Sequence, residues 1–313
     1  MDFVIFILAM GALIVGADFI VNQSERIALH FNISEFVIGA TIIALGTSLP
    51  EMAASVAASY GGKSDIAIAN VIGSNILNIT FVLAIIFMIT QNINPDRDFF
   101  AKDAIWAMLP VIIFLIMSLD GMISRFDGML LLILMFAYMV FLIDDSKGLR
   151  TEAIEDIDED AFTWSSTIGL MILGFIFVVG GAHFAIESAS NIAHEFGVSE
   201  WIIGIIMISF GTSLPEVVVS ISAAIKGKVD MAVGNVIGSN LANITMVIGL
   251  SAMVKNLPIS LLENYFDIAT MTAATIILVY ITANKLYSRP AGISLFIVLA
   301  IFLEHTLAGM GQV

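Results

Sequence analysis

The chain has 313 residues, of which 59% are hydrophobic and 12% charged, and its mean hydropathy is +1.02. Soluble globular proteins carry about 25% charged residues, so the composition predicts an all-α polytopic membrane protein. The absence of cysteine excludes disulfides and thiolate metal centres, and with only four histidines we expect no zinc or iron chemistry and no cofactor. The formal net charge of -15 argues against nucleic acid and anionic substrates.

Ten apolar segments have the length of about 18–25 residues that a membrane-crossing helix needs. They lie near residues 2–21, 36–60, 66–90, 102–119, 126–143, 166–186, 201–225, 231–254, 265–283 and 290–309. We interpret the first as a retained span, because no basic region or small-residue cleavage site typical of a signal peptide accompanies it. The polar segment 144–163 divides the chain into two five-helix halves, 1–143 and 164–313.

The two halves repeat each other at an offset of 165 residues. Gly46–Glu51 (GTSLPE) recurs as Gly211–Glu216, and Asn70–Asn75 (NVIGSN) recurs as Asn235–Asn240. About half of the positions from 16 to 82 are identical to their counterparts without a gap, so the chain contains an internal duplication. The most similar stretches are about 36–82 and 201–247.

Each copy contains five spans. Because five is an odd number, the chain ends its first copy on the other side of the membrane, and the second copy enters the membrane from that opposite side. The sequence therefore predicts ten transmembrane helices arranged as two inverted five-helix repeats, with a binding site near the midplane where they meet. The distribution of Lys and Arg tests the topology. Nine lie in the loops after spans 1, 3, 5, 7 and 9, and three on the other side, which places both termini outside and the 144–163 linker in the cytoplasm.

Each copy places a carboxylate and two hydroxyl groups on one face of an apolar helix. Thr47 and Ser48 precede Glu51 by four and three residues, which brings the three side chains to the same side. Pro50 has no N–H, so the carbonyl of Gly46 loses its helical partner and becomes a further oxygen ligand. The second copy repeats this set as Thr212, Ser213, Pro215 and Glu216. Because a carboxylate inside a membrane is costly, it marks an ion or substrate path by default.

Only oxygen ligands recur in this pattern. Spans 3 and 8 add further ones: Ser74, Asn75, Asn78, Ser239, Asn240 and Asn243. A flexible all-oxygen site suits Ca²⁺ better than Mg²⁺, and Na⁺ also takes oxygens. One Ca²⁺ or two Na⁺ neutralises the charge of two ionised glutamates. One site could therefore hold either load, and exchange requires this. Taken singly, a buried Ser, Thr or Asn more often only bonds a neighbouring helix.

Three alternatives remain. A cation channel would need a continuous pore, whereas duplicated broken helices favour alternating access. An intramembrane hydrolase using Ser48 or Ser213 lacks a recurring base. The acidic segment 144–163 lacks the ligand spacing of an EF-hand, which favours a solvated linker over a Ca²⁺ sensor.

The motifs resemble those of a known family. Gly39-Ala40-Thr41 with Gly46–Glu51 and Asn70–Asn78 is similar to the first alpha-repeat of the sodium/calcium exchanger family, prokaryotic type, in the calcium/cation antiporter superfamily, and residues 204–243 resemble the second. The resemblance implies exchange of Ca²⁺ for Na⁺ by alternating access, with spans 1 and 6 sliding as gates. It further implies that Glu51 and Glu216 bridge Ca²⁺. The other ligands that it implies are Thr47, Thr212, Ser48, Ser213, Ser74, Ser239, Asn78 and Asn243, with the backbone carbonyls of Ala44 and Ser209.

Two residues depart from the family pattern. Well-known members carry Asp at the position of Asn243, and a small apolar residue is frequent at Ser209. The missing titratable group leaves the coupling ratio open, so a H⁺- or K⁺-coupled Ca²⁺/cation antiporter is the alternative. We expect Ca²⁺ and Na⁺ as substrates, the lipid bilayer as surroundings, no obligate protein partner, and a location in a prokaryotic plasma (inner) membrane.

Overall fold

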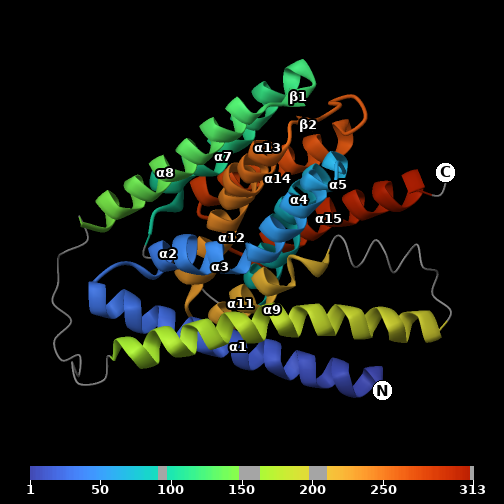
Figure 1. Ribbon diagram of the computed structural model, residues 1–313. Coiled ribbons are helices and arrows are strands. Elements are labelled where there is room, and N and C mark those ends of the chain that lie inside the picture. Colours follow the sequence, from blue (N-terminus) through green and yellow to red (C-terminus); the bar gives the residue numbers. More distant parts are fainter. Residues whose placement is uncertain (91–96, 148–162, 197–209, 311–313) are drawn as a thin grey trace. The chain divides into compact units, whose positions relative to one another are not determined.

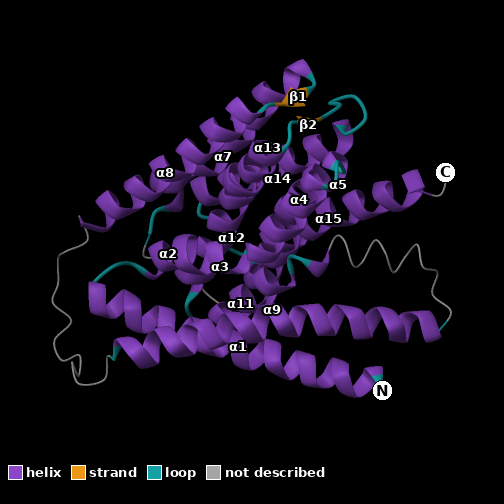
Figure 2. Ribbon diagram, viewed as in Figure 1, coloured by secondary structure: helices purple, strands orange, loops and turns teal. Residues whose placement is uncertain are grey.

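The computed structural model describes residues 1–90, 97–147, 163–196 and 210–310. These residues are helical except for turns, loops and one short two-stranded ladder (Figures 1 and 2). Among them, eight helices are long and apolar enough to cross a membrane. The pair Glu35–Thr47 and Leu49–Tyr60, bent by 44° at Ser48, makes a ninth span if it is counted as one. The expectation of an all-helical polytopic fold is confirmed. The predicted span 201–225 lies partly outside the described residues, and its described part is α11, Leu214–Ile225.

The chain forms two compact units that do not coincide with the halves of the sequence. The first unit contains residues 1–48 and 137–238, and the second contains residues 49–136 and 239–313. Each unit therefore combines segments from both copies of the repeat. One boundary falls between Ser48 and Leu49, where the interrupted span breaks.

In the first unit, two long helices run side by side (Figure 1). They are α1 (Asp2–Phe31) and α9 (Trp164–Glu195). Glycines allow this approach: a Cβ added to Gly16 would lie 2.7 Å from the carbonyl oxygen of Gly174, and one added to Gly174 would lie 2.9 Å from that of Gly16. Small residues at such contacts bring helix backbones close in membrane proteins.

Both helices extend about ten residues beyond the predicted spans, 2–21 and 166–186. Hydropathy detects only the apolar part of a helix, whereas backbone hydrogen bonds continue wherever polar side chains find partners. On α1, Asp18 forms an ion pair with Lys226, and Glu25 forms one with Lys228. Lys228 also contacts Glu35 at 2.8 Å. Burial alone lowers the pKa of Lys228, but its hydrogen bonds to the two glutamates and their negative charges outweigh burial and raise this pKa above the ordinary lysine value.

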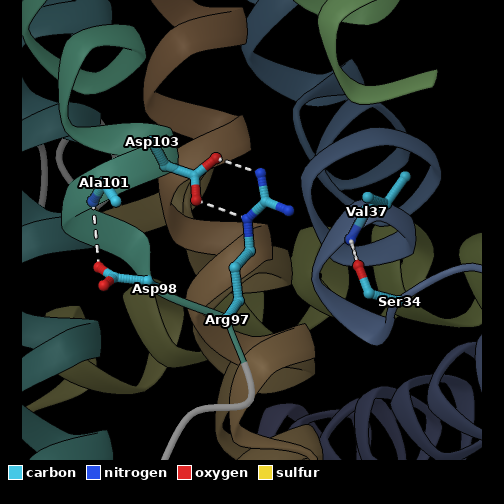
Figure 3. Close-up of polar contacts among 6 residues, drawn as sticks. All are labelled: Ser34, Val37, Arg97, Asp98, Ala101 and Asp103. Carbon is cyan, nitrogen blue, oxygen red and sulfur yellow. Dashed lines mark hydrogen bonds and ion pairs between the residues drawn. The ribbon is translucent and has the colours of Figure 1, made fainter. Parts of the chain in front are cut away.

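The rest of the first unit holds short helices and breaks. They are α2 (Glu35–Ile38), the π-helix η1 (Gly39–Ile43), α3 (Ala44–Thr47), α11, and α12 (Val229–Ala242) as far as Gly238. The hydroxyl of Ser34 caps α2 by accepting the N–H of Val37 at 3.4 Å (Figure 3). A Cβ added to Gly234 would lie 2.5 Å from the carbonyl of Phe36, so the backbones of α2 and α12 are in direct contact.

The second unit contains most of the remaining helices. They are α4 (Leu49–Tyr60), α5 (Ser64–Leu77), the π-helix η2 (Asn78–Leu83), α6 (Ala84–Ile89), α7 (Phe99–Met117), the 3₁₀ turn η3 (Ser118–Asp120), the π-helix η5 (Asn243–Ile248), α13 (Gly249–Val254), α14 (Tyr265–Ala283) and α15 (Arg289–Met310). Strands β1 (Met122–Ile123) and β2 (Leu257–Pro258) pair antiparallel.

Helix α8 (Arg125–Lys147) begins in the second unit and ends in the first. It continues through Lys147, so residues 144–147, the start of the predicted linker, are helical; residues 148–162 lie outside the described part of the chain.

A buried ion pair stands at the start of α7 (Figure 3). Arg97 donates from Nε to Asp103 at 2.6 Å and from its terminal nitrogen at 2.9 Å, with Asp103 fully buried. Asp98 caps the helix by accepting the N–H of Ala101 at 3.0 Å. The bidentate geometry satisfies both charges, as a buried pair requires.

The two copies of the repeat have helices with matching ends. Residue for residue at the offset of 165, α4 matches α11, α5 matches α12, η2 matches η5, and α6 matches α13. The spans Ser64–Ile89 and Val229–Val254 are 72% and 78% buried, whereas the other long spans are 22–39% buried. These two duplicated spans are therefore far more buried than the other long spans among the described residues.

Candidate cation-binding site

In the first unit, a set of oxygen-bearing side chains surrounds Glu216. The Ser48 hydroxyl donates to Glu216 Oε1 at 2.9 Å, and both side chains are buried. Thr47 Oγ1 lies 3.3 Å from the Ala44 carbonyl and 3.4 Å from Asn235 Oδ1. The second oxygen of Glu216 has no hydrogen-bond partner among the described residues, so this buried carboxylate retains an acceptor that protein groups do not use.

The helix breaks where the sequence places its hydroxyl residues. Ser48 follows α3 with φ -81° and ψ 5°, and Ser213 precedes α11 with φ -84° and ψ -1°. Pro50 and Pro215 come two residues later and cannot donate a backbone hydrogen bond. The Ala44 carbonyl still accepts the N–H of Ser48 at 3.1 Å, so this carbonyl belongs to the last helical turn before the break. The break leaves Ser48 outside a regular helix while its side chain remains buried.

In the second unit, the predicted residues are buried, and two of them form hydrogen bonds with further asparagines. Glu51, Asn78 and Asn243 are fully buried, as is Ser239, and Ser74 is nearly so. Asn78 and Asn243 begin the π-helices η2 and η5, and π-helical turns frequently occur at functional sites. Asn78 and Asn243 donate their amide nitrogens to Asn240 and Asn75, each at 3.0 Å.

The structure brings some predicted residues together in one unit, assigns others to the second unit and leaves one undescribed. Thr47 and Ser48 lie near Glu216 in the first unit, whereas Glu51 belongs to the second unit. Ser213 is buried and Thr212 half-buried. Ser209 lies outside the described residues. Among the residues that the structure does describe, no group of three or more His, Asp or Glu side chains is arranged to hold a metal ion, so any cation here also needs hydroxyl, amide or carbonyl oxygens.

Sequence reasoning missed Asn235 and Ser220 as parts of the site. Asn235 donates from Nδ2 to Ser220 at 2.8 Å, which orients its oxygen toward Thr47. The first copy contains the equivalent bond, from Asn70 to Ser55 at 3.0 Å. The two asparagines lie 165 residues apart, as do the two serines, so their recurrence in the repeat could have identified them as candidate site residues.

Comparison with known proteins identifies the family. The family model "Sodium/calcium exchanger protein" matches residues 1–143 and 166–308. A membrane protein of Methanocaldococcus jannaschii, MJ0091, is 40% identical over 253 residues, covering 81% of this chain and 82% of its own length. The sodium/calcium exchanger MaX1 of Methanosarcina acetivorans is 28% identical, covering 96% and 97%. The sodium/potassium/calcium exchanger 4 of Homo sapiens is 28% identical, over only 41% of this chain and 21% of its own length.

Solved structures show the same relationship. The sodium-calcium exchanger NCX_Mj, soaked without Na⁺ and Ca²⁺, matches with a TM-score of 0.84 and 33% identity over 97% of this chain and 98% of that chain. The same exchanger soaked with 2.5 mM Na⁺ and 10 mM Sr²⁺ matches with a TM-score of 0.83 and 34% identity. Sequence motifs, family model and fold all agree, and the chain belongs to the sodium/calcium exchanger family of membrane cation antiporters.

Proposed function

We propose that this protein exchanges Ca²⁺ for Na⁺ across the membrane by alternating access. The observation that carries the proposal is the environment of Glu216. Its carboxylate is fully buried, accepts a hydrogen bond from Ser48, and has no Lys, Arg or His within ion-pair distance among the described residues. Burying an uncompensated charge costs several kcal/mol, so an ionised Glu216 calls for a bound cation.

The proposed ligands are the recurring oxygens. Glu51 and Glu216 supply the charge, and Thr47, Ser48, Thr212, Ser213, Ser74, Ser239, Asn78, Asn243 and the carbonyls of Ala44 and Ser209 supply neutral oxygens. Two carboxylates balance either one Ca²⁺ or two Na⁺, so both loads leave the protein interior neutral. Carboxylate, hydroxyl and carbonyl oxygens are the ligands that Ca²⁺ takes in proteins.

The proposed architecture is ten spans in two inverted five-helix repeats, 1–143 and 164–313. Two features support it: the helix ends that match at an offset of 165, and the reciprocal hydrogen bonds between equivalent asparagines. The excess of Lys and Arg on one side supports external termini and a cytoplasmic loop after α8. The proposed location is a prokaryotic plasma (inner) membrane, where Na⁺ entering down its gradient would drive Ca²⁺ out.

A second cation coupling has specific support. The partial match to sodium/potassium/calcium exchangers covers 41–42% of the chain, and Asn243 removes a titratable group from the second copy. Participation of K⁺ is therefore the second candidate, with the same Ca²⁺ ligands and one additional monovalent ion.

The test is Ca²⁺ uptake into proteoliposomes that contain the purified protein. Vesicles are loaded with Na⁺, with K⁺, with Na⁺ and K⁺ together, with choline, or at acid pH. Uptake that requires internal Na⁺ and ignores K⁺ supports Na⁺/Ca²⁺ exchange. Uptake that needs both Na⁺ and K⁺ supports the second candidate, and uptake driven equally by a proton gradient contradicts both. Uptake without any counter-ion would identify a channel.

A further inference from the structure

Four asparagines in the second unit bond to one another in a reciprocal pattern. Asn75 donates from Nδ2 to the backbone carbonyl of Asn240 at 3.2 Å, and Asn240 donates to the carbonyl of Asn75 at 3.2 Å. The side-chain oxygens of the same two residues accept from Asn243 and Asn78, respectively, each at 3.0 Å. The pattern therefore links each copy of the repeat to the other.

This pattern determines which way each amide faces. A backbone carbonyl can only accept, so Asn75 and Asn240 must direct their nitrogens to it and keep their oxygens as acceptors. Those oxygens in turn require the nitrogens of Asn243 and Asn78 as donors. Reversing any one amide would place two acceptors against each other. The hydrogen bonds therefore fix which atom of each amide is the oxygen and which is the nitrogen, an assignment that is often ambiguous.

The consequence is a pair of buried oxygens with no hydrogen-bond donor. Asn78 Oδ1 and Asn243 Oδ1 have no hydrogen-bond partner among the described residues, and both side chains are fully buried. Buried polar atoms are normally satisfied by protein, by water or by an ion. An amide oxygen whose nitrogen is already held cannot rotate to find a donor and remains available to a cation.

We propose that Asn75 and Asn240 are positioning residues for cation binding. Asn240 holds Asn78, and Asn75 holds Asn243, each with its oxygen free to accept a Ca²⁺ or Na⁺ ion. The inference rests on the proposed function, since the cation is the transported one. It also explains why both copies contain Asn at positions 78 and 243: an ionised carboxylate at either position could not donate to its partner amide.

The experiment uses Asn75→Ala and Asn240→Ala, each alone and combined with Asn78→Ala. Two quantities are measured on the full-length protein. One is the Ca²⁺ concentration for half-maximal uptake into Na⁺-loaded proteoliposomes, and the other is the rise in Tm that Ca²⁺ produces in the detergent-purified protein. Ser59→Ala is the control, because Ser59 is a buried polar side chain of the same unit that donates to the backbone carbonyl of Ser251 at 2.8 Å, and the second copy has Ala224 at the equivalent position.

Each single variant is expected to raise the half-saturating Ca²⁺ concentration about 10–100-fold, as loss of an outer ligand-holding group does. In the Asn78→Ala background, Asn240→Ala is expected to add nothing, whereas Asn75→Ala still weakens binding because it acts through Asn243. This crossed pattern, in which only one of the two double variants binds Ca²⁺ more weakly than Asn78→Ala alone, identifies a positioning role. A general loss of stability would weaken binding in both double variants. Ser59→Ala is expected to lower the Tm without changing the half-saturating Ca²⁺ concentration.

Unchanged half-saturation in both single variants, or equal effects of the two in the Asn78→Ala background, would overturn the inference. Its failure is distinguishable from failure of the proposed function. If Ca²⁺ stabilises the wild-type protein but is not exchanged, the proposed function is contradicted. The rise in Tm with Ca²⁺, compared among the same variants, then still tests the role of the asparagines. A wild-type protein that neither exchanges Ca²⁺ nor is stabilised by it overturns both.

Discussion

The two copies of the repeat share the ends of four duplicated helices and the buried Glu, Ser and Asn residues of the predicted site, yet they differ in the turn that joins the first two of these helices. In the first copy this turn is Tyr60–Lys63, and Lys63 is exposed. In the second copy it is Ile225–Lys228, and both of its lysines form ion pairs with acidic residues of α1 or the start of α2. Within this chain, the buried residues of the predicted site are identical in the two copies, whereas the two turns differ in both sequence and ion pairs.

The largest effect is expected from removing the duplicated carboxylates. Glu51→Gln and Glu216→Gln keep the shape of the side chain but remove the negative charge that a cation must balance, so each is expected to reduce Na⁺-dependent Ca²⁺ uptake to the background of empty vesicles. Asp65→Asn is the control, because Asp65 also recurs in register, as Asp230, but is exposed at the first turn of α5. Ca²⁺ exchange retained by either glutamine variant would contradict the site.

A smaller effect is expected from the hydroxyl at the helix break. Ser48→Ala removes the donor to Glu216 and should raise the half-saturating Ca²⁺ concentration about tenfold, the equivalent of about 1.4 kcal/mol. Ser213→Ala makes the corresponding change in the second copy. Equal shifts would mean that the copies contribute alike to binding, and a shift confined to one would show that they have specialised. Purified protein of both variants should elute as wild type in size-exclusion chromatography.

The paired bonds behind the site provide a comparison in stability. Ser55→Ala and Ser220→Ala leave the amides of Asn70 and Asn235 without their serine acceptors, and each is expected to lower the free energy of unfolding by about 1–3 kcal/mol. Thermal denaturation in detergent measures the change. Ser220→Ala should also weaken Ca²⁺ binding, because Asn235 lies against Thr47. Unchanged Ca²⁺ affinity in a destabilised Ser220→Ala variant would contradict this role of Asn235.

The smallest effect concerns the surface turn. Lys228→Met removes a half-exposed ion pair to Glu25 and Glu35 and should cost about 0.2–1 kcal/mol, whereas Lys63→Met should cost less. Because the pKa of Lys228 is raised in the folded protein, its contribution is complete below the ordinary lysine pKa of about 10.4 and is lost only as the pH rises beyond it. The difference in Tm between wild type and Lys228→Met should therefore stay constant from neutral pH up to about 10.

The duplication carried most of the information about the fold. Span 265–283 is α14 residue for residue, and the prolines at 50 and 215 placed the breaks that the structure contains at Ser48 and Ser213. Hydropathy did not predict the helix ends where helices continue beyond their apolar residues. Helix α1 ends at Phe31 and not near residue 21, and α8 continues to Lys147. On α1, contacts such as the ion pair of Glu25 with Lys228 satisfy polar side chains beyond the apolar part, so their polarity does not end the helix.

The sequence by itself determined the membrane class, the repeat, the family and the paired glutamates, because apolar length and in-register identity are properties of the chain alone. Only the tertiary structure decided which oxygens remain available. Thr47 meets Asn235 across 188 positions, and Asn78 and Asn243 depend on asparagines 162 and 168 positions away. An amide offers both a donor and an acceptor, and which of them faces a cation depends on the partner that folding places against the other.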